Sequence, residues 1–118
     1  MSHKNKNIEI GKKGEAMAAE YLRKLNYQIL ERNYRKGRVE IDIIARLDKK
    51  LVFVEVKTRT GYAYGLPEEA VDEAKQESIE ACAEEYILDA KWEGHIRFDI
   101  IAVNLNESDP ITHFTDVF

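Results

Sequence analysis

The sequence predicts an α/β domain in which a mixed sheet is flanked by helices, in two or three layers. Apolar residues such as Ala18, Leu22 and Leu25 recur at helical spacing near the start, and three runs rich in β-branched residues follow. A second helical segment lies between the third and fourth strands, where it provides a crossover connection. With 118 residues, 44% of them hydrophobic, the chain is expected to form one domain spanning 1–118.

Each predicted element has its own local signals. Asn26 is a suitable residue to end the first helix, and the polar residues 47–50 and the basic residues 35–38 are suitable turns between strands. Pro67 fits the first turn of the second helix. We therefore expect helices at 11–26 and 67–90, strands at 27–34, 39–46, 51–59 and 95–103, and an edge strand at 111–118.

The cysteine content and the N-terminal residues indicate where in the cell the protein is expected. The single cysteine, Cys82, cannot form an intramolecular disulfide, and its position on a helical stripe predicts a core residue. The N-terminal residues are polar and no stretch has the length of a membrane span. We therefore expect a cytoplasmic protein without a membrane partner.

Charge is distributed unevenly along the chain. The net charge is −4, but residues 1–60 hold 15 Lys and Arg against 8 Asp and Glu, whereas residues 61–118 hold 3 against 14. The first half therefore carries +7 and the second −11. A basic face of this kind is typical of phosphate binders, although charged faces also segregate without any function.

Acidic and basic side chains interrupt two of the predicted strands. Because side chains alternate, Glu55 and Lys57 share a face of the third strand. On the second strand, alternation predicts that Glu40, Asp42 and Ile44 share one face. The opposite face carries the apolar residues Val39, Ile41, Ile43 and Ala45. A tight turn near Asp48 would place Asp42 and Glu55 close together at one end of the sheet.

A further carboxylate lies on the apolar stripe of the first helix. Glu15 precedes Ala18, Leu22 and Leu25 at helical spacing. A buried carboxylate costs several kcal/mol unless a cation or a hydrogen-bond donor compensates. Glu15 is therefore expected to meet such a partner, for instance a metal ion or Lys57.

These side chains are suited to metal-assisted hydrolysis of a phosphodiester. Carboxylates without accompanying His or Cys favour Mg²⁺ or Mn²⁺ over zinc. Lys57 is suited to orienting a water or neutralising charge in the transition state. The alternative for each position alone is structural: Asp42 is a satisfied strand acid or a surface residue, and Glu55 and Lys57 form cross-strand or same-face salt bridges. The three histidines show no ligand spacing, so we assign them no chemistry.

Several segments in order along the chain resemble a known family. The arrangement of Asp42 with Glu55-x-Lys57 after an opening helix resembles the PD-(D/E)xK nuclease superfamily. The whole chain resembles the YraN-type family of endonuclease-like proteins, related to archaeal Holliday junction resolvases. The segments that carry this resemblance are Gly11-x-x-Gly14-Glu15, Arg32-Asn33, Glu40-Ile41-Asp42-Ile43-Ile44-Ala45, Val52 to Arg59, Pro67 to Val71, Lys75-Gln76 and Arg97-Phe98-Asp99.

The resemblance implies a restriction-endonuclease-like core with an active site. It implies that Asp42 and Glu55 are metal ligands, that Lys57 is the catalytic lysine, and that Glu15 completes the site. The implied activity is metal-dependent cleavage of DNA, including branched or junction DNA. By analogy with resolvases, which cut two strands symmetrically, a homodimer is also expected.

Other residues are candidates for contacts with DNA, or are simply solvated charges. Tyr62 and Tyr64 are suited to stacking on an unpaired base or to covering an edge of the core. The basic candidates are Arg35, Lys36, Arg38, Arg59, Lys75 and Arg97. Two other functions stay open: a nucleic-acid-binding or partner-recruiting module without turnover, and a protein-binding domain that uses the acidic second helix.

Overall fold

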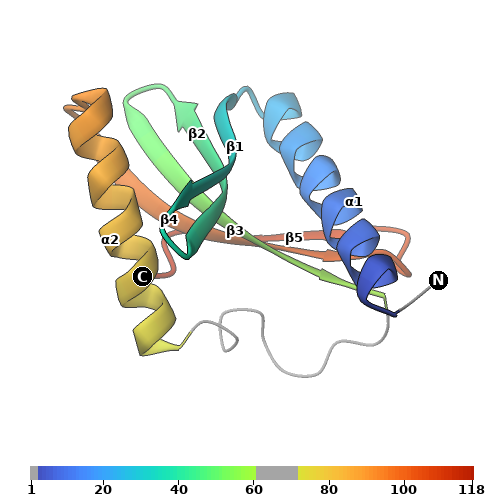
Figure 1. Ribbon diagram of the computed structural model, residues 1–118. Helices are drawn as coiled ribbons and strands as arrows, with labels where there is room; N and C mark the ends of the chain where they lie inside the picture. The colour runs from blue at the N-terminus through green and yellow to red at the C-terminus, as the bar shows by residue number, and fades with distance from the viewer. Residues whose placement is uncertain (1–2, 61–71) are drawn as a thin grey trace.

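The computed structural model describes residues 3–60 and 72–118, which form two helices and a five-stranded sheet. Figure 1 shows the elements in chain order. Their bounds are α1 His3–Lys24, β1 Gln28–Lys36, β2 Val39–Leu47, β3 Lys50–Arg59, α2 Glu73–Ala90, β4 His95–Asn104 and β5 Ile111–Phe114. The predicted order of elements is confirmed.

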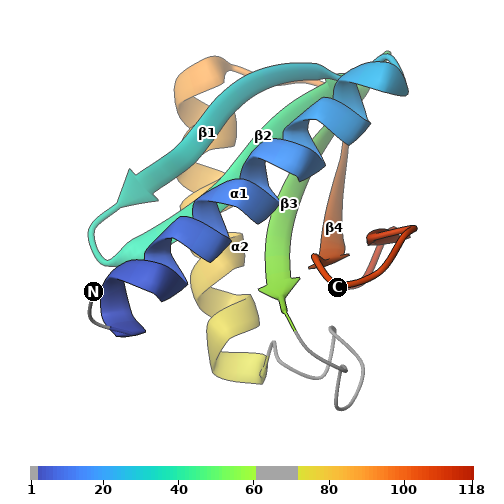
Figure 2. The same cartoon turned by 90° about the vertical axis from the view of Figure 1, so that its right-hand side faces the viewer.

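The sheet is mixed, as predicted. The strands lie in the order β1-β2-β3-β4-β5, and all neighbours are antiparallel except β3 and β4, which are parallel. Helix α2 connects these two parallel strands. Figures 1 and 2 show α1 and α2 on opposite faces of the sheet, so the domain has three layers. This architecture is consistent with a restriction-endonuclease-like core.

Helix α1 starts earlier than the sequence predicts. It begins at His3 rather than at residue 11, so its first turns are the polar and lysine-rich N-terminal segment. Its end agrees with the prediction, because Asn26 adopts a left-handed conformation with φ 71°. The Tyr27 amide donates back to the Leu22 carbonyl at 3.0 Å, which closes the helix end.

Helix α2 starts later than the sequence predicts. Asp72 has an extended backbone, and its side chain accepts a hydrogen bond from the Lys75 amide at 2.8 Å. Asp72 is therefore the N-cap and Glu73 the first helical residue, rather than Pro67. Pro67, Tyr62 and Tyr64 lie outside the described residues.

Each face of the sheet has its own apolar core. Ala18, Ala19 and Leu22 of α1 pack on one face, and Ile79, Cys82 and Ala83 of α2 pack on the other. The prediction that Cys82 is a core residue is confirmed, since its exposure is 4%. Among the described helices, none combines the length and apolar character that a membrane crossing requires.

The alternation predicted for β2 is wrong at one point. Ile41 and Ile44 both pack with the residues of α2, whereas Ile43 and Ala45 pack with those of α1. Strict alternation would place Ile41 and Ile43 on one face. The side-chain pattern is therefore interrupted around Asp42, which lies between them.

The interruption coincides with a fork between β2 and β3. Their pairing covers Ile43–Leu47 and Lys50–Val54, so that Ile43 opposite Val54 is the last pair. Beyond it, β2 continues its ladder with β1, and β3 continues with β4 as far as Arg59. Asp42 and Glu55 are the first residues of the two diverging arms.

The C-terminal segment departs from the predicted edge strand. Strand β5 ends at Phe114 rather than at residue 118, because Asp116 adopts φ 54° and its amide donates to Asp99 at 3.0 Å. Arg97 makes two hydrogen bonds to Asp99 at 2.8 and 2.9 Å, and His113 makes another at 2.7 Å. Arg97 is thus committed to an ion pair with the buried Asp99, so its charge is used within the fold rather than simply solvated.

Candidate metal centre

Three carboxylates from two elements converge beside the fork. Glu15 of α1 meets Glu40 and Asp42 of β2, with one oxygen of each lying within 4.8 Å of the others. All three side chains are half-buried. Two carboxylates at about 5 Å repel by roughly 3 kcal/mol at an effective dielectric constant near 20. This cluster therefore attracts cations.

A close approach of α1 to β3 places Glu15 at this position. Gly14 faces Thr58, and a Cβ at residue 14 would lie 1.8 Å from Thr58 Oγ1. Only a residue without a side chain fits there. The next residue, Glu15, is thereby held above the arm of β2 that carries Asp42.

An amide and a guanidinium contact the outer side of the cluster. Asn33 Nδ2 donates to both Glu15 oxygens at 3.0 and 3.2 Å, and to Glu40 Oε1 at 2.8 Å. Arg35 donates to Glu40 Oε2 at 2.7 Å. The Arg35 hydrogen bond, together with that of Asn33, holds the pKa of Glu40 below its usual value against the effect of burial. Asn33 itself has φ 54°, a costly conformation within a strand.

Glu55 is the most deeply buried acid of the fork. It is 6% exposed, and among the described residues its Oε1 has no hydrogen-bond partner. Its Oε2 lies 3.8 Å from Lys75 Nζ. A buried carboxylate oxygen without a donor is costly unless a cation or water fills the gap.

Burial and mutual repulsion disturb the titration of the site. Burial raises the pKa of Asp42 to about 6, and the charges of Glu15 and Glu40 add to this, although the Val56 amide donates to Asp42 at 2.7 Å. Burial and the charge of Asp42 raise the pKa of Glu55 to about 8. Burial, followed by the neighbouring Lys75, lowers the pKa of Lys57. Such opposed shifts in one cluster are typical of functional sites.

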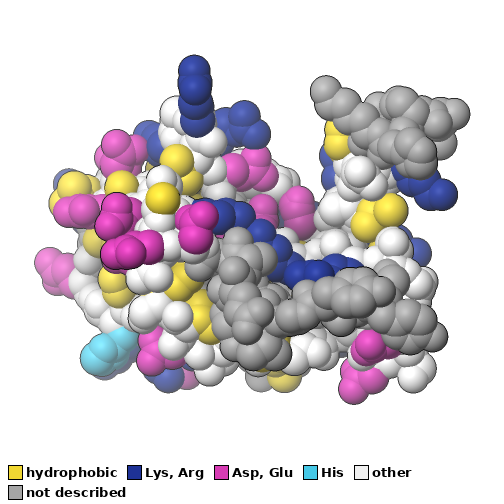
Figure 3. Space-filling view, turned by 90° about the horizontal axis from the view of Figure 1, so that it is seen from below, with side chains coloured by type: hydrophobic (Ala, Val, Ile, Leu, Met, Phe, Trp, Pro, Cys, Tyr) yellow, Lys and Arg dark blue, Asp and Glu magenta, His cyan; other side chains and the backbone are white. Residues whose placement is uncertain are grey.

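The predicted basic residues divide into two groups. Arg35, Arg59 and Lys75 lie at the carboxylates: Arg35 on Glu40, Lys75 on Glu55, and Arg59 along a hollow that Glu15 and Asp42 also line. Lys36 and Arg38 lie on the β1–β2 turn, across from α2. In Figure 3, Lys and Arg side chains gather in the middle of this end of the molecule, while acidic side chains gather on the side of α2.

The structure brings Glu15 and Asp42 together with Glu40, whereas Glu55 and Lys57 lie outside this group of three. Glu15 lies next to Asp42, and Glu55 and Lys57 follow Val54 along the other arm of the fork. Glu40, which alternation predicts on the same face as Asp42, is the third member of the cluster. Asn33 was missed as a contact of the site, because no local pattern indicates its left-handed backbone or its reach across two elements.

The donor set fits a hard divalent cation. The three acids of the cluster and the nearby Glu55 all offer oxygen, and the described cluster contains neither His nor Cys. Oxygen ligands of this kind suit Mg²⁺ or Mn²⁺. The unpartnered Glu55 Oε1 provides independent support, since a cation would satisfy it.

Fold and site together define the class of protein: an α/β domain of PD-(D/E)xK-like architecture, with its carboxylates at a strand fork. A model of the uncharacterised protein family UPF0102, the YraN-type family, matches residues 14–103. The chain therefore belongs to this family, which confirms the predicted resemblance.

Individual relatives agree with this assignment. A UPF0102 protein of Chloroherpeton thalassium is 49% identical over 105 residues, which cover 88% of this chain and 81% of the relative. One from Chlorobium chlorochromatii is 43% identical over 125 residues, covering 100% and 97%. One from Caldanaerobacter subterraneus is 44% identical over 114 residues, covering 92% and 93%. The similarity thus extends over nearly the whole of each chain.

Proposed function

We propose that this protein is a Mg²⁺- or Mn²⁺-dependent endonuclease that hydrolyses phosphodiester bonds of DNA, including branched or junction DNA. One observation carries the proposal: Glu55 is buried, its Oε1 has no hydrogen-bond partner among the described residues, and its pKa is raised by burial and by the charge of Asp42, which belongs to the cluster of three carboxylates. An arrangement of this kind is unfavourable in itself and becomes favourable with a cation among the acids.

The site residues have distinct parts in this proposal. Asp42, Glu55 and Glu15 would hold the ion, with Glu40 as a further ligand. When bound, the ion supplies a Lewis acid for a phosphoryl oxygen and lowers the pKa of a bound water. Lys57 follows Val56 on the same strand as Glu55, and it would stabilise negative charge that develops on the phosphate. Arg59 and Arg35, at the rim of the site, supply cations for the flanking backbone phosphates.

A panel of duplex, flapped and four-way junction DNA, incubated with Mg²⁺ or Mn²⁺, tests the proposal. We expect nicking by the wild type and a loss of at least about a hundredfold in Asp42→Ala and Lys57→Ala, with DNA binding retained. Asp109→Ala and Lys24→Ala remove the same charges at exposed positions and serve as matched controls. Equal activity in the site variants and the wild type would mean that a contaminant cuts the DNA.

A second candidate is a DNA-binding module without turnover. It is favoured by Asn33 and Arg35, which already satisfy oxygens of Glu15 and Glu40 by hydrogen bonds. This function predicts salt-dependent DNA binding that is unaffected by added metal. Cleavage that requires Asp42 would exclude it.

A further inference from the structure

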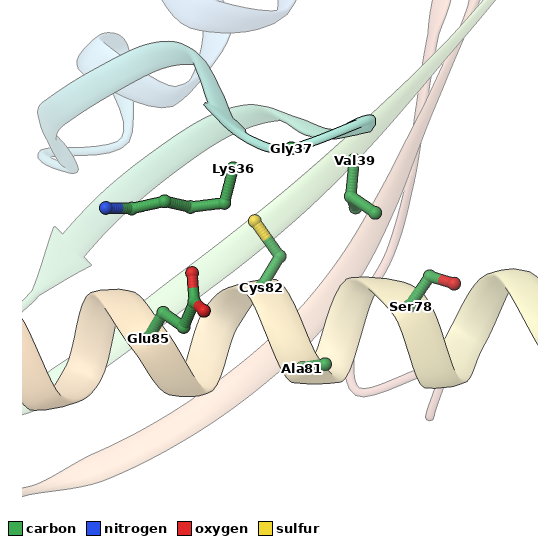
Figure 4. A pocket seen from close by; sticks show the side chains of 7 residues that line it. All are labelled: Lys36, Gly37, Val39, Ser78, Ala81, Cys82 and Glu85. Carbon is green, nitrogen blue, oxygen red and sulfur yellow. The ribbon is translucent and has the colours of Figure 1, made fainter.

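A groove runs between the turn of the β1–β2 hairpin and α2, and we call it the hairpin groove. It consists of two neighbouring hollows of about 390 and 400 Å³, both lined by Val39 and Ser78. Figure 4 shows Lys36 and Val39 of the hairpin facing Ser78, Cys82 and Glu85 of the helix in the first hollow. The second hollow continues toward the fork.

The groove has an apolar floor and a cationic rim. Val39, Ala74 and Ile79 line the floor of the second hollow, where Arg38 and Lys75 provide positive charge. Lys36 adds a third cation at the first hollow, opposite Glu85. Lys36 Nζ also lies 3.6 Å from Asp89 Oδ2, so the far end of the groove is neutralised by acids. The second hollow has the cations Arg38 and Lys75 against the single carboxylate of Glu40, so anionic ligands are favoured there over the far end.

The groove is continuous with the candidate metal centre. Glu40 belongs to the carboxylate cluster and also lines the second hollow. Lys75 lines the same hollow and lies 3.8 Å from Glu55. A chain that passes the metal centre can thus enter the groove without leaving the surface of the protein.

The size of the hollows restricts the occupant. Each has the volume of a small-molecule pocket rather than of a surface for a double helix. An apolar floor with cations at its rim suits the face of a base and the adjoining phosphate. We propose that the hairpin groove binds an unpaired nucleotide of the DNA, next to the bond that is cut. The proposal rests on the nuclease function above and assigns it a substrate with a single-stranded segment at the cleavage site.

Binding of labelled DNA, measured by fluorescence anisotropy without divalent metal, tests the groove separately from cleavage. The probes are a blunt duplex and the same duplex with a short unpaired tail of either polarity. We expect the wild type to bind one tailed duplex at least about fivefold more tightly than the blunt one. Ser78→Trp and Ala81→Trp fill the groove from exposed helix positions and should remove this preference. Ala90→Trp, on the same helix but outside the groove, should retain it.

Each result has a defined meaning for the two proposals. Equal affinity of the wild type for blunt and tailed DNA, or a preference that survives in both groove-filling variants, overturns the hairpin groove. Cleavage of DNA without any such preference overturns the groove and leaves the nuclease function intact. A preference for tailed DNA without cleavage in Mg²⁺ or Mn²⁺ supports the groove and overturns the nuclease function. Failure of the wild type to bind either DNA overturns the proposal for the hairpin groove, and the cleavage panel with Mg²⁺ or Mn²⁺ then decides the nuclease function.

Discussion

Two buried carboxylates lie on neighbouring strands of the same sheet and differ in their hydrogen-bond partners. Asp99 of β4 is 1% exposed and receives hydrogen bonds from Arg97, His113 and the Asp116 amide. Glu55 of β3 is 6% exposed, and in the described part of the chain its Oε1 has no donor. Burial opposes the charge of Asp99, yet hydrogen bonds from His113 and Arg97 keep its pKa below the ordinary value. For Glu55 the effect of burial prevails, and its pKa is raised to about 8.

The difference separates a structural acid from a functional one. Asp99 connects β4 to β5, and His113 extends the connection to α1 through Tyr21 at 3.1 Å. All of these contacts are internal to the fold. Glu55 has weaker compensation: its Oε2 lies 3.8 Å from Lys75 Nζ, its Oε1 has no hydrogen-bond partner among the described residues, and the charge of Asp42 repels it. A fold retains such an arrangement where a ligand completes it.

The largest expected effect distinguishes the two acids by stability. Asp99→Asn leaves the Arg97 guanidinium buried without its counter-charge, which should lower the free energy of unfolding by about 3 to 5 kcal/mol. The matched change Glu55→Gln replaces a carboxyl group whose charged form is disfavoured by burial, so stability should stay unchanged or rise. Urea unfolding without metal measures both. Similar losses in the two variants would show that Glu55 is a structural acid as well.

The pH dependence of stability should also differ between the two acids. The pKa of Asp99 is lowered from 3.8, so its contribution is present above that value and is lost as the pH falls. The pKa of Glu55 is raised from 4.5 to about 8, so the folded state binds the extra proton in this range. Stability should therefore fall by a few kcal/mol as the pH rises from about 4.5 to 8. The raised pKa of Asp42, about 6 against 3.8, adds to the lower part of this decline.

Thermal unfolding in metal-free buffer across this pH range measures the decline. Glu55→Gln should flatten the curve between about pH 7 and 8, where Asp42, with a pKa of about 6, is largely deprotonated. A metal-free wild type whose stability is constant or increases from pH 4.5 to 8 would contradict the assigned direction for Glu55.

Much of the site could be predicted because it depends on local rules. Alternation along the third strand placed Glu55 and Lys57 on one face, and the tight turn at Asp48 placed Asp42 next to Glu55. Helical spacing alone placed Glu15 on the buried side of α1. These inferences need only the period of an element and the length of a turn.

The remaining features depend on long-range contacts that no local pattern encodes. The break in alternation near Asp42 follows from the fork, where β2 leaves β3. Asn33 reaches Glu15, which lies 18 residues away. The network of Asp99 was not predicted, because His113 and Tyr21 are separated by 92 residues. The role of Arg97 was consequently not foreseen: it pairs with the buried Asp99.

The smallest expected effects concern the acids at the rim of the cluster. Without metal, Glu15→Gln and Asp42→Asn relieve repulsion among half-buried carboxylates, at the cost of weaker hydrogen bonds from Asn33 and the Val56 amide. The two effects offset one another, so stability should be unchanged or raised by up to about 1 kcal/mol. Urea unfolding of both variants checks this expectation. A loss above about 2 kcal/mol in both would indicate structural salt bridges instead.

The central claim is that the acids of the fork form a binding site for a divalent cation. Calorimetric titration with Mn²⁺ at neutral pH, repeated in two buffers of different ionisation enthalpy, tests it most directly. Because the pKa of Glu55 is raised to about 8, the metal must displace a proton, so the measured heat should depend on the buffer. In Glu55→Gln, binding should weaken and the dependence on buffer should disappear. Absence of Mn²⁺ binding to the wild type, or identical titrations of the wild type and Glu55→Gln, would contradict the account.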